Sequence, residues 1–168
     1  MAYRDAKAPP IVTYLGGVLV AADAETGERV WTRPLGTPVL RMVLAWRHVF
    51  VAVPSVSRPE ISDVVWFDVH TGDKRGELDA GFRITAALAR GTHVYFGGEE
   101  ASIALSADGT LLFTIRVETV TQGFLSNETN LVARDAAGRE MWREKTTSSH
   151  GAGVLLLGDA VAQPDFDS

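Results

Sequence analysis

The sequence predicts an all-β protein built from repeated antiparallel hairpins. Short apolar and β-branched runs alternate with turn residues along most of the 168-residue chain, which is the pattern of strands joined by tight connections. Four of the turns share a glycine, and three of these glycines are followed, four positions later, by an aromatic residue. The turns also recur at a spacing close to one β-propeller blade, which takes roughly 40 to 50 residues. We therefore expect about four propeller blades.

The clearest copy of the repeat covers residues 21–31. The apolar run at 18–22 favours a half-buried strand. Asp23 can accept hydrogen bonds from the backbone of the following residues, and Gly27 supplies the positive φ of a tight turn without steric cost. A strand then resumes at Trp31. These features predict a strand, a turn and a second strand.

Three more copies follow the first, with decreasing fidelity. The four glycines are 45, 37 and 29 residues apart, at Gly27, Gly72, Gly109 and Gly138. The position four residues after each glycine is occupied in turn by Trp31, Gly76, Phe113 and Trp142. The third and fourth turns are one residue shorter than the first two. Self-similarity at this period in a strand-rich chain indicates propeller blades.

The first copy, Ala-x-Asp-x-x-Thr-Gly-x-x-x-Trp at 21–31, resembles the tryptophan-docking repeat of quinoprotein-type (PQQ-like) β-propellers, and residues 133–142 resemble a shortened version. The resemblance implies that each tryptophan packs against the turn of the neighbouring blade and fixes the geometry between blades. Phe113 would replace the tryptophan in the third copy, and Gly76 departs from the pattern. The implied docking residues are Asp23, Thr26, Gly27, Trp31, Asp68, Thr71, Gly72, Gly109, Phe113, Asp135, Gly138 and Trp142.

The first half of the chain divides at its glycines and prolines. We expect an N-terminal arm at 1–10, ending at two prolines, and a hairpin turning at Gly16-Gly17. The run at 39–46 is apolar nearly throughout, as expected for an inner strand covered on both faces, and Arg47 and His48 would form its turn. The expected strands are residues 11–15, 18–22, 28–33, 39–46, 48–53, 64–68 and 74–78.

The least regular segment lies between residues 54 and 63, where prolines and serines accumulate. We expect a surface loop between two strands of the second blade. Loops of this kind often carry recognition, so the candidate interaction residues are Pro54, Arg58, Pro59 and Glu60. The alternative is an insertion that is tolerated without a function.

The second half repeats the pattern until the fourth blade. Only about a dozen residues separate the third blade from the fourth docking hairpin, fewer than two strands of usual length and their turns require, so we expect a compressed fourth blade. Residues 154–163 would form a last strand pair, followed by an acidic tail at 164–168. The expected strands are residues 84–89, 93–97, 102–106, 111–116, 131–135, 139–143, 154–157 and 160–163.

The order of the strands leaves two ways of closing the propeller. The pair at 154–163 could complete the first blade beside residues 11–15 in a small ring closed within one chain. Alternatively, the single domain at 11–163 is an open arc that a second copy completes. An open arc would expose strand edges and apolar faces unless a partner covers them, and PQQ-like repeats usually build larger rings. We therefore expect a homo-oligomer, namely a dimer that completes the ring.

The composition limits the classes of partner and the cellular location that we expect for the protein. The formal net charge is −5 and no basic patch stands out, so we expect no nucleic-acid partner. No apolar stretch approaches the length of a membrane span. The chain has no cysteine, which excludes disulfides and thiolate chemistry and fits a cytoplasmic location.

The residues offer little catalytic chemistry. The four histidines, His48, His70, His93 and His150, show no metal-ligand spacing, and no nucleophile elbow or phosphate-binding loop is present. Glu99-Glu100 is expected in a turn, and Asp159, Asp165 and Asp167 lack the flanks of a calcium loop. Quinoprotein dehydrogenases commonly hold their cofactor with a vicinal disulfide and calcium ligands, so the resemblance implies a member without catalytic, cofactor or metal residues.

Two functions are therefore weighed. The first is a non-enzymatic interaction or assembly scaffold that uses the ring faces, the strand edges or the loop at 54–63 to bind proteins. The second is a propeller that senses or binds a small ligand on its ring axis, as a cofactor-less remnant of an oxidoreductase. Convergent polar side chains around a central pocket would favour the second function. We expect the first.

Overall fold

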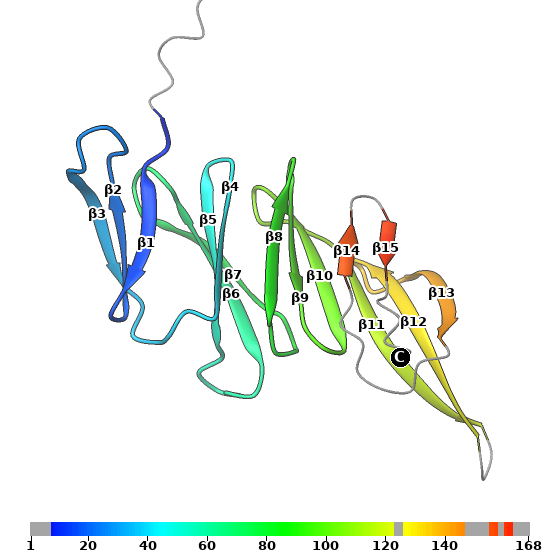
Figure 1. The fold of residues 1–168 in the computed structure, drawn as a ribbon. Helices are drawn as coiled ribbons and strands as arrows, with labels where there is room; N and C mark the ends of the chain where they lie inside the picture. Colours follow the sequence, from blue (N-terminus) through cyan, green and yellow to red (C-terminus); the bar gives the residue numbers. More distant parts are fainter. Residues whose placement is uncertain (1–7, 123–125, 147–154, 158–159, 163–168) are drawn as a thin grey trace, which may run out of the picture.

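The structure is a computed structural model that describes residues 8–122, 126–146, 155–157 and 160–162. In these ranges every regular element is a β-strand, and every strand pair is antiparallel. Three of the sheets stand side by side, as the blades of a propeller do (Figure 1). The fold is thus all-β, with blade-like sheets. No helix in the described ranges could cross a membrane.

The first sheet has three strands and lies at one end of the row of sheets (Figure 1). Its strands lie in the order β1-β2-β3, and β1 forms one edge. Ile11 and Leu15 on β1 are 62% and 63% exposed, so this edge presents apolar side chains to solvent. The strands are β1 (Ile11–Leu15), β2 (Val18–Ala22) and β3 (Arg29–Pro34).

The second sheet is a complete four-stranded blade in the order β4-β5-β6-β7. Its middle strands β5 and β6 are buried almost throughout, because the first sheet covers one face and the third sheet the other. This explains their nearly continuous apolar sequence. The strands are β4 (Arg41–Ala45), β5 (His48–Pro54), β6 (Ser62–Asp68) and β7 (Lys74–Asp79).

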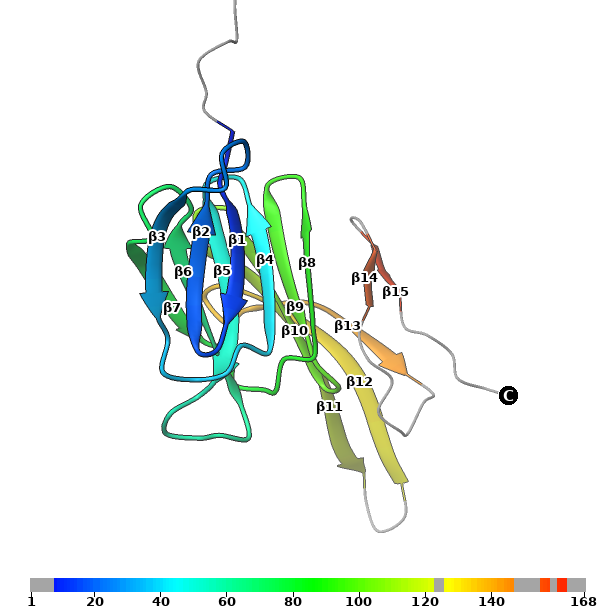
Figure 2. The same ribbon diagram turned by 60° about the vertical axis from the view of Figure 1, so that its left-hand side comes forward.

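The third sheet has six strands instead of four, in the order β13-β12-β11-β10-β9-β8. The expected separate fourth blade is therefore not formed, and its docking hairpin extends the third sheet (Figure 2). The strands are β8 (Ala86–Arg90), β9 (His93–Gly97), β10 (Ala101–Ser106), β11 (Leu111–Gln122), β12 (Ser126–Asp135) and β13 (Glu140–Thr146).

The length of β11 causes this difference. The strand expected to end at Arg116 continues to Gln122 and pairs with β12 from Phe113 opposite Asp135 to Gln122 opposite Ser126. Residues 117–121 are rich in valine and threonine, which favour extended backbone. Arg134 on β12 and Arg143 on β13 both form ion pairs with Glu118 on β11, so the added strands are also joined by charge.

The remaining described strands, β14 (Leu155–Leu157) and β15 (Ala160–Ala162), pair with each other. Neither pairs with β1 in the described residues. The first of the two ways of closing the propeller, in which this pair completes the first blade beside β1, is thus not formed in the described residues. The three larger sheets form an open row, not a ring closed within the chain (Figure 1).

Apolar side chains fill the two spaces between the sheets. One cluster joins the first two sheets around Leu19, Trp31 and Val51, and a larger cluster joins the second and third sheets around Phe50 and Phe96. At the inner edge, β4 lies beside β8. Each Å² of apolar surface buried between the sheets contributes about 25 cal/mol of favourable free energy, and this burial holds the blades together.

Candidate functional site

The first two docking turns are built alike. A side-chain oxygen of Asp23 accepts hydrogen bonds from the backbone N–H groups of Glu25 and Thr26, at 3.0 and 3.1 Å. Asp68 accepts the equivalent bonds from His70 and Thr71, at 2.9 and 3.1 Å. The aspartate therefore satisfies the backbone of the turn in both copies, as expected from its position.

Asp68 is the more buried of the turn carboxylates and also pairs with a cation. Its side chain is 5% exposed and lies 3.0 Å from the Arg75 guanidinium. Burial alone would raise the pKa of Asp68, but the hydrogen bonds from His70, Thr71 and Arg75 outweigh it and lower the pKa. The carboxylate thus stays ionised and holds the turn in shape.

Trp31 makes the joint between the first and second sheets. Its ring covers Gly72 so closely that a Cβ added there would lie 2.6 Å from a ring carbon. The indole Nε1 donates a hydrogen bond of 2.8 Å to the carbonyl oxygen of Val69. Arg33 adds a hydrogen bond to the Gly72 carbonyl and an ion pair with Asp73. In this structure Trp31 lies where the resemblance implies.

Trp66 makes the joint between the second and third sheets. The position equivalent to Trp31 is Gly76, and Trp66 faces Gly76 directly across β6 and β7. The Trp66 ring occupies the space of the missing Gly76 side chain and also covers Gly109 of the third sheet, since a Cβ at either glycine would overlap it. The docking aromatic of the second blade is therefore supplied by the neighbouring strand.

Among the residues that the structure describes, no aromatic ring covers the fourth turn. A Cβ added at Gly138 would meet no atom within 4 Å, because the hairpin of Gly138 lies in the same sheet as Phe113. Phe113 and Trp142 instead pack on a small cluster around Ile115. The docking of Phe113 on the fourth turn is thus not formed in the described structure, and Trp142 of the fourth copy packs within its own sheet instead of on the turn of a neighbouring blade.

Gly27 marks the open end of the row. It has a φ of +71°, nearly the value of +70° at Gly72, and a Cβ there would also meet no atom within 4 Å. The first turn therefore has the shape of a docking turn but has no ring on it in the described residues.

The predicted interaction loop is shorter than expected and partly ordered by its own contacts. Pro54 ends β5 and Ser62 begins β6, so the connection is residues 55–61. The N–H of Ser55 donates to the carbonyl of Ile61 at 3.0 Å, and Arg58 forms an ion pair with Asp79 on β7. Pro59 and Glu60 are exposed, as expected for a surface loop.

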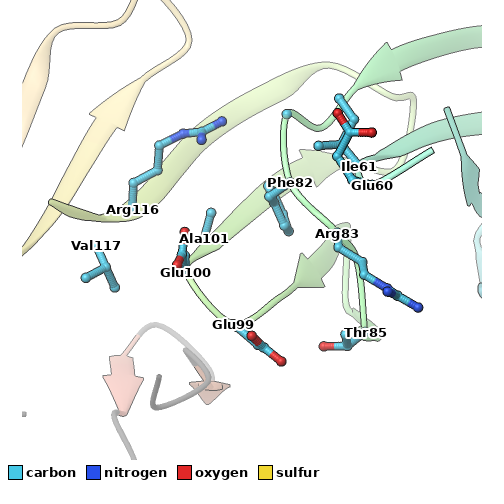
Figure 3. Close-up of a pocket in the computed structure, with 11 residues that line it drawn as sticks. Glu60, Ile61, Phe82, Arg83, Thr85, Glu99, Glu100, Ala101, Arg116 and Val117 are labelled. Carbon is cyan, nitrogen blue, oxygen red and sulfur yellow. The ribbon is translucent and has the colours of Figure 1, made fainter. Parts of the chain in front are cut away.

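A cavity of about 660 Å³ adjoins this loop. Figure 3 shows the side chains around it, which come from the loop, the crossing between β7 and β8, the β9–β10 turn and β11. The lining combines apolar and charged side chains: Ile61, Phe82, Ala101 and Val117 are apolar, and Glu60, Arg83, Glu99, Glu100 and Arg116 are charged. The cavity thus lies in the groove between the second and third sheets, and not on a ring axis where a sensor site was considered.

The inner hairpins of the second and third sheets turn at Trp46-Arg47 and at Gly91-Thr92. Trp46 was expected to end the preceding strand, but β4 ends at Ala45 and His48 already belongs to β5. The Arg47 carbonyl accepts a 2.8 Å hydrogen bond from Val69 N–H, and the Thr92 carbonyl accepts an equivalent bond from Ala107. Each inner turn is therefore fixed to the docking turn of its own blade.

The remaining titratable candidates stand apart from one another. His48 Nδ1 lies 2.7 Å from the Ala107 carbonyl, so His48 joins the second sheet to the docking turn of the third sheet. His93 Nδ1 lies 3.3 Å from the Thr92 hydroxyl in its own hairpin. Glu99 and Glu100 lie in a turn, as expected. In the ranges that the structure describes, no group of three histidine, cysteine or acidic residues could hold a metal ion. Asp159, Asp165, Asp167 and His150 lie outside those ranges.

The sequence pattern missed Trp46 and Trp66. The alignment compares the residues four positions after each glycine, which all lie on the expected outer strand of a blade. It therefore finds no docking aromatic residue in the second blade, where that position is Gly76. A tryptophan opposite that glycine was the available signal for Trp66. For Trp46 the signal was its alignment with Gly91 in the following blade.

Comparisons with known proteins give distant structural likenesses alone. No family model and no curated protein matches the chain. Among solved structures, BamB from Moraxella catarrhalis is similar at 20% identity and a TM-score of 0.46, over 86% of this chain and 51% of BamB. A europium-containing methanol dehydrogenase is similar at 12% identity and a TM-score of 0.46, over 91% of this chain and 44% of the enzyme. The chain spans about half the length of these proteins.

Proposed function

We propose that the protein is a non-enzymatic assembly scaffold whose blade row is continued by a second copy of the chain. The observation that carries the proposal is the uncovered turn at Gly27. Turns of the same kind at Gly72 and Gly109 each seat an indole from the preceding blade. Gly27 has the backbone to do the same, and no preceding blade is present in the described residues to supply a ring.

The surface around this turn supports the same reading. Ile11, Leu15 and Val30 on the first sheet are 62%, 63% and 43% exposed. In the second and third sheets, the corresponding faces are covered by a neighbouring sheet. An apolar sheet face that no other sheet covers in the described residues is a surface suited to association. A second copy is the partner that already carries complementary blade faces.

The experiment is a measurement of native mass by light scattering at low micromolar concentration. The proposal predicts a species of at least twice the chain mass of 18.1 kDa. Gly27→Ala should shift the equilibrium towards the single chain, because its Cβ would meet the incoming ring. A single-chain mass for the wild type would overturn the proposal.

The matched control is Gly138→Ala. Both glycines have positive φ, +71° and +80°, and both turns are open, so an alanine strains the backbone similarly in each. Only Gly27 is proposed to seat a ring from another copy. Equal effects of the two substitutions on native mass would contradict the role of Gly27. The expected cytoplasmic location and the lack of enzyme activity stay predictions.

A further inference from the structure

We propose that the Trp46 turn binds an acidic polypeptide segment, with Trp46 as the apolar anchor and Arg47 and Arg90 as the carboxylate ligands. This surface belongs to the inner hairpins of the second and third sheets, and it is distinct from the open end at Gly27. The inference therefore does not depend on assembly with a second copy.

The backbone at Trp46 is the first observation. Trp46 has a φ of +51° and is the only non-glycine residue of the described chain with a positive φ. The equivalent residue in the next blade is Gly91, with a φ of +57°. A bulky residue in this region is strained, and glycine would remove the strain. The backbone conformation of this turn therefore favours glycine over tryptophan.

The exposure of the side chain is the second observation. Trp46 is 77% exposed, whereas Trp31 and Trp66 are each 8% exposed. Its indole thus contributes little to the core. Exposed tryptophans are common anchors of protein interfaces, because one ring buries a large area for few rotatable bonds.

The turn is also held in place before any partner arrives. The Arg47 carbonyl accepts a hydrogen bond from the N–H of Val69. The carbonyl of Val69 in turn accepts the indole hydrogen bond of Trp31. The backbone of the turn that carries Trp46 is therefore attached through two successive hydrogen bonds to the joint between the blades, which lowers the entropy lost when the turn backbone is fixed in a complex.

The charge beside Trp46 specifies the partner. Arg47 and Arg90 are exposed, and neither side chain forms a hydrogen bond or an ion pair within the described residues. Arg90 ends β8, which lies beside β4, and the turns that follow both strands are at the same end of the sheets (Figure 1). The nearby turn carboxylates of Asp68 and Asp108 are already hydrogen-bonded in their own turns. Two free guanidinium groups favour carboxylates.

The test uses two fluorescently labelled peptides, one of alternating glutamate and leucine and one of alternating lysine and leucine. Fluorescence anisotropy with the full chain should show saturable binding of the acidic peptide alone. Trp46→Gly should weaken that binding by about tenfold or more, as loss of an anchor does, without lowering the melting temperature. The paired substitution Arg47→Glu with Arg90→Glu should abolish it.

Matched controls lie at the opposite ends of the same sheets. Arg83→Glu removes an exposed arginine there, and Val56→Gly removes a 94% exposed apolar side chain. Both should leave acidic-peptide binding unchanged. Equal binding of the two peptides, no saturable binding of the acidic peptide, or an unchanged affinity in Trp46→Gly would each overturn the proposal. Native mass, measured in parallel, reports separately on the assembly at Gly27.

Discussion

Trp66 lies across Gly76, the residue that faces it on the neighbouring strand. The glycine leaves a space on the blade surface, and the indole passes through that space to Gly109 of the next sheet. The two residues thus act as a unit. In the first joint the ring is that of Trp31 on the outer strand β3. In the second joint it is that of Trp66 on β6, the strand next to the outer strand β7.

The first prediction concerns the energy of this joint. Trp66 is 8% exposed and stacks on Phe50 with ring centroids 5.7 Å apart. Trp66→Ala should lower the free energy of unfolding by about 3–5 kcal/mol, the usual cost of removing a large buried aromatic side chain. Urea denaturation measures the change. Trp46→Gly is the control, since it removes an exposed ring and should cost far less; equal losses would contradict the assigned roles.

The second prediction tests whether the anchor can change strands. The double variant Trp66→Gly with Gly76→Trp places the indole at the position that Trp31 occupies in the first blade. It should recover a substantial part of the stability lost in Trp66→Gly, because the ring would still reach Gly109. Gly76→Trp alone should be destabilising, since two rings would compete for one space. A double variant no more stable than Trp66→Gly would show that the strands are not interchangeable.

The third prediction is a dependence of stability on pH. The folded-state pKa of Asp68 is lowered, so its contribution to stability is fully present above the unfolded pKa, which is about 3.9. The contribution is lost as the pH falls through the folded pKa. Asp68→Asn should therefore reduce stability at neutral pH and make little difference in strong acid. A difference that does not shrink on acidification, measured by urea denaturation across pH, would contradict this assignment.

The fourth prediction tests the six-stranded sheet. Thr119 and Thr129 face each other on β11 and β12, and facing residues of antiparallel strands are within reach of a disulfide. The chain has no cysteine, so Thr119→Cys with Thr129→Cys should give a single intramolecular disulfide, seen by mass spectrometry of the oxidised monomer. Thr119→Cys with Ala133→Cys is the out-of-register control. If Thr119 instead lay in a separate compressed blade, the first pair would remain reduced.

Much of the blade pattern could be predicted from local sequence. Residues 11–15, 18–22 and 93–97 form strands with the expected bounds, because alternation and flanking glycines define them without reference to the rest of the chain. The joint of Trp31 on Gly72 could also be anticipated, since its Asp-Thr-Gly turn and its tryptophan both lie at fixed positions in the repeat.

The rest depends on partners that lie far apart in the sequence. Residues 117–122 have the composition of either a short blade strand or a continuation of β11, and pairing with β12 decides between them. The role of Trp66 follows from an empty space across the sheet, and the backbone of Trp46 follows from the turn that its flanking strands impose. None of these can be deduced from the local pattern alone.

The two joints differ in which strand holds the ring, and this has a mechanical consequence. In the first blade the indole is that of Trp31 on β3, the edge strand of the sheet. Separation of β3 from the sheet would therefore also remove Trp31 from its contact with Gly72 of the second sheet. In the second blade the indole is that of Trp66 on β6, so β7 can separate from the sheet while the contact between Trp66 and Gly109 of the third sheet stays intact. Force applied at the outer strands β3 and β7 would therefore separate the first sheet from the second before it separates the second sheet from the third.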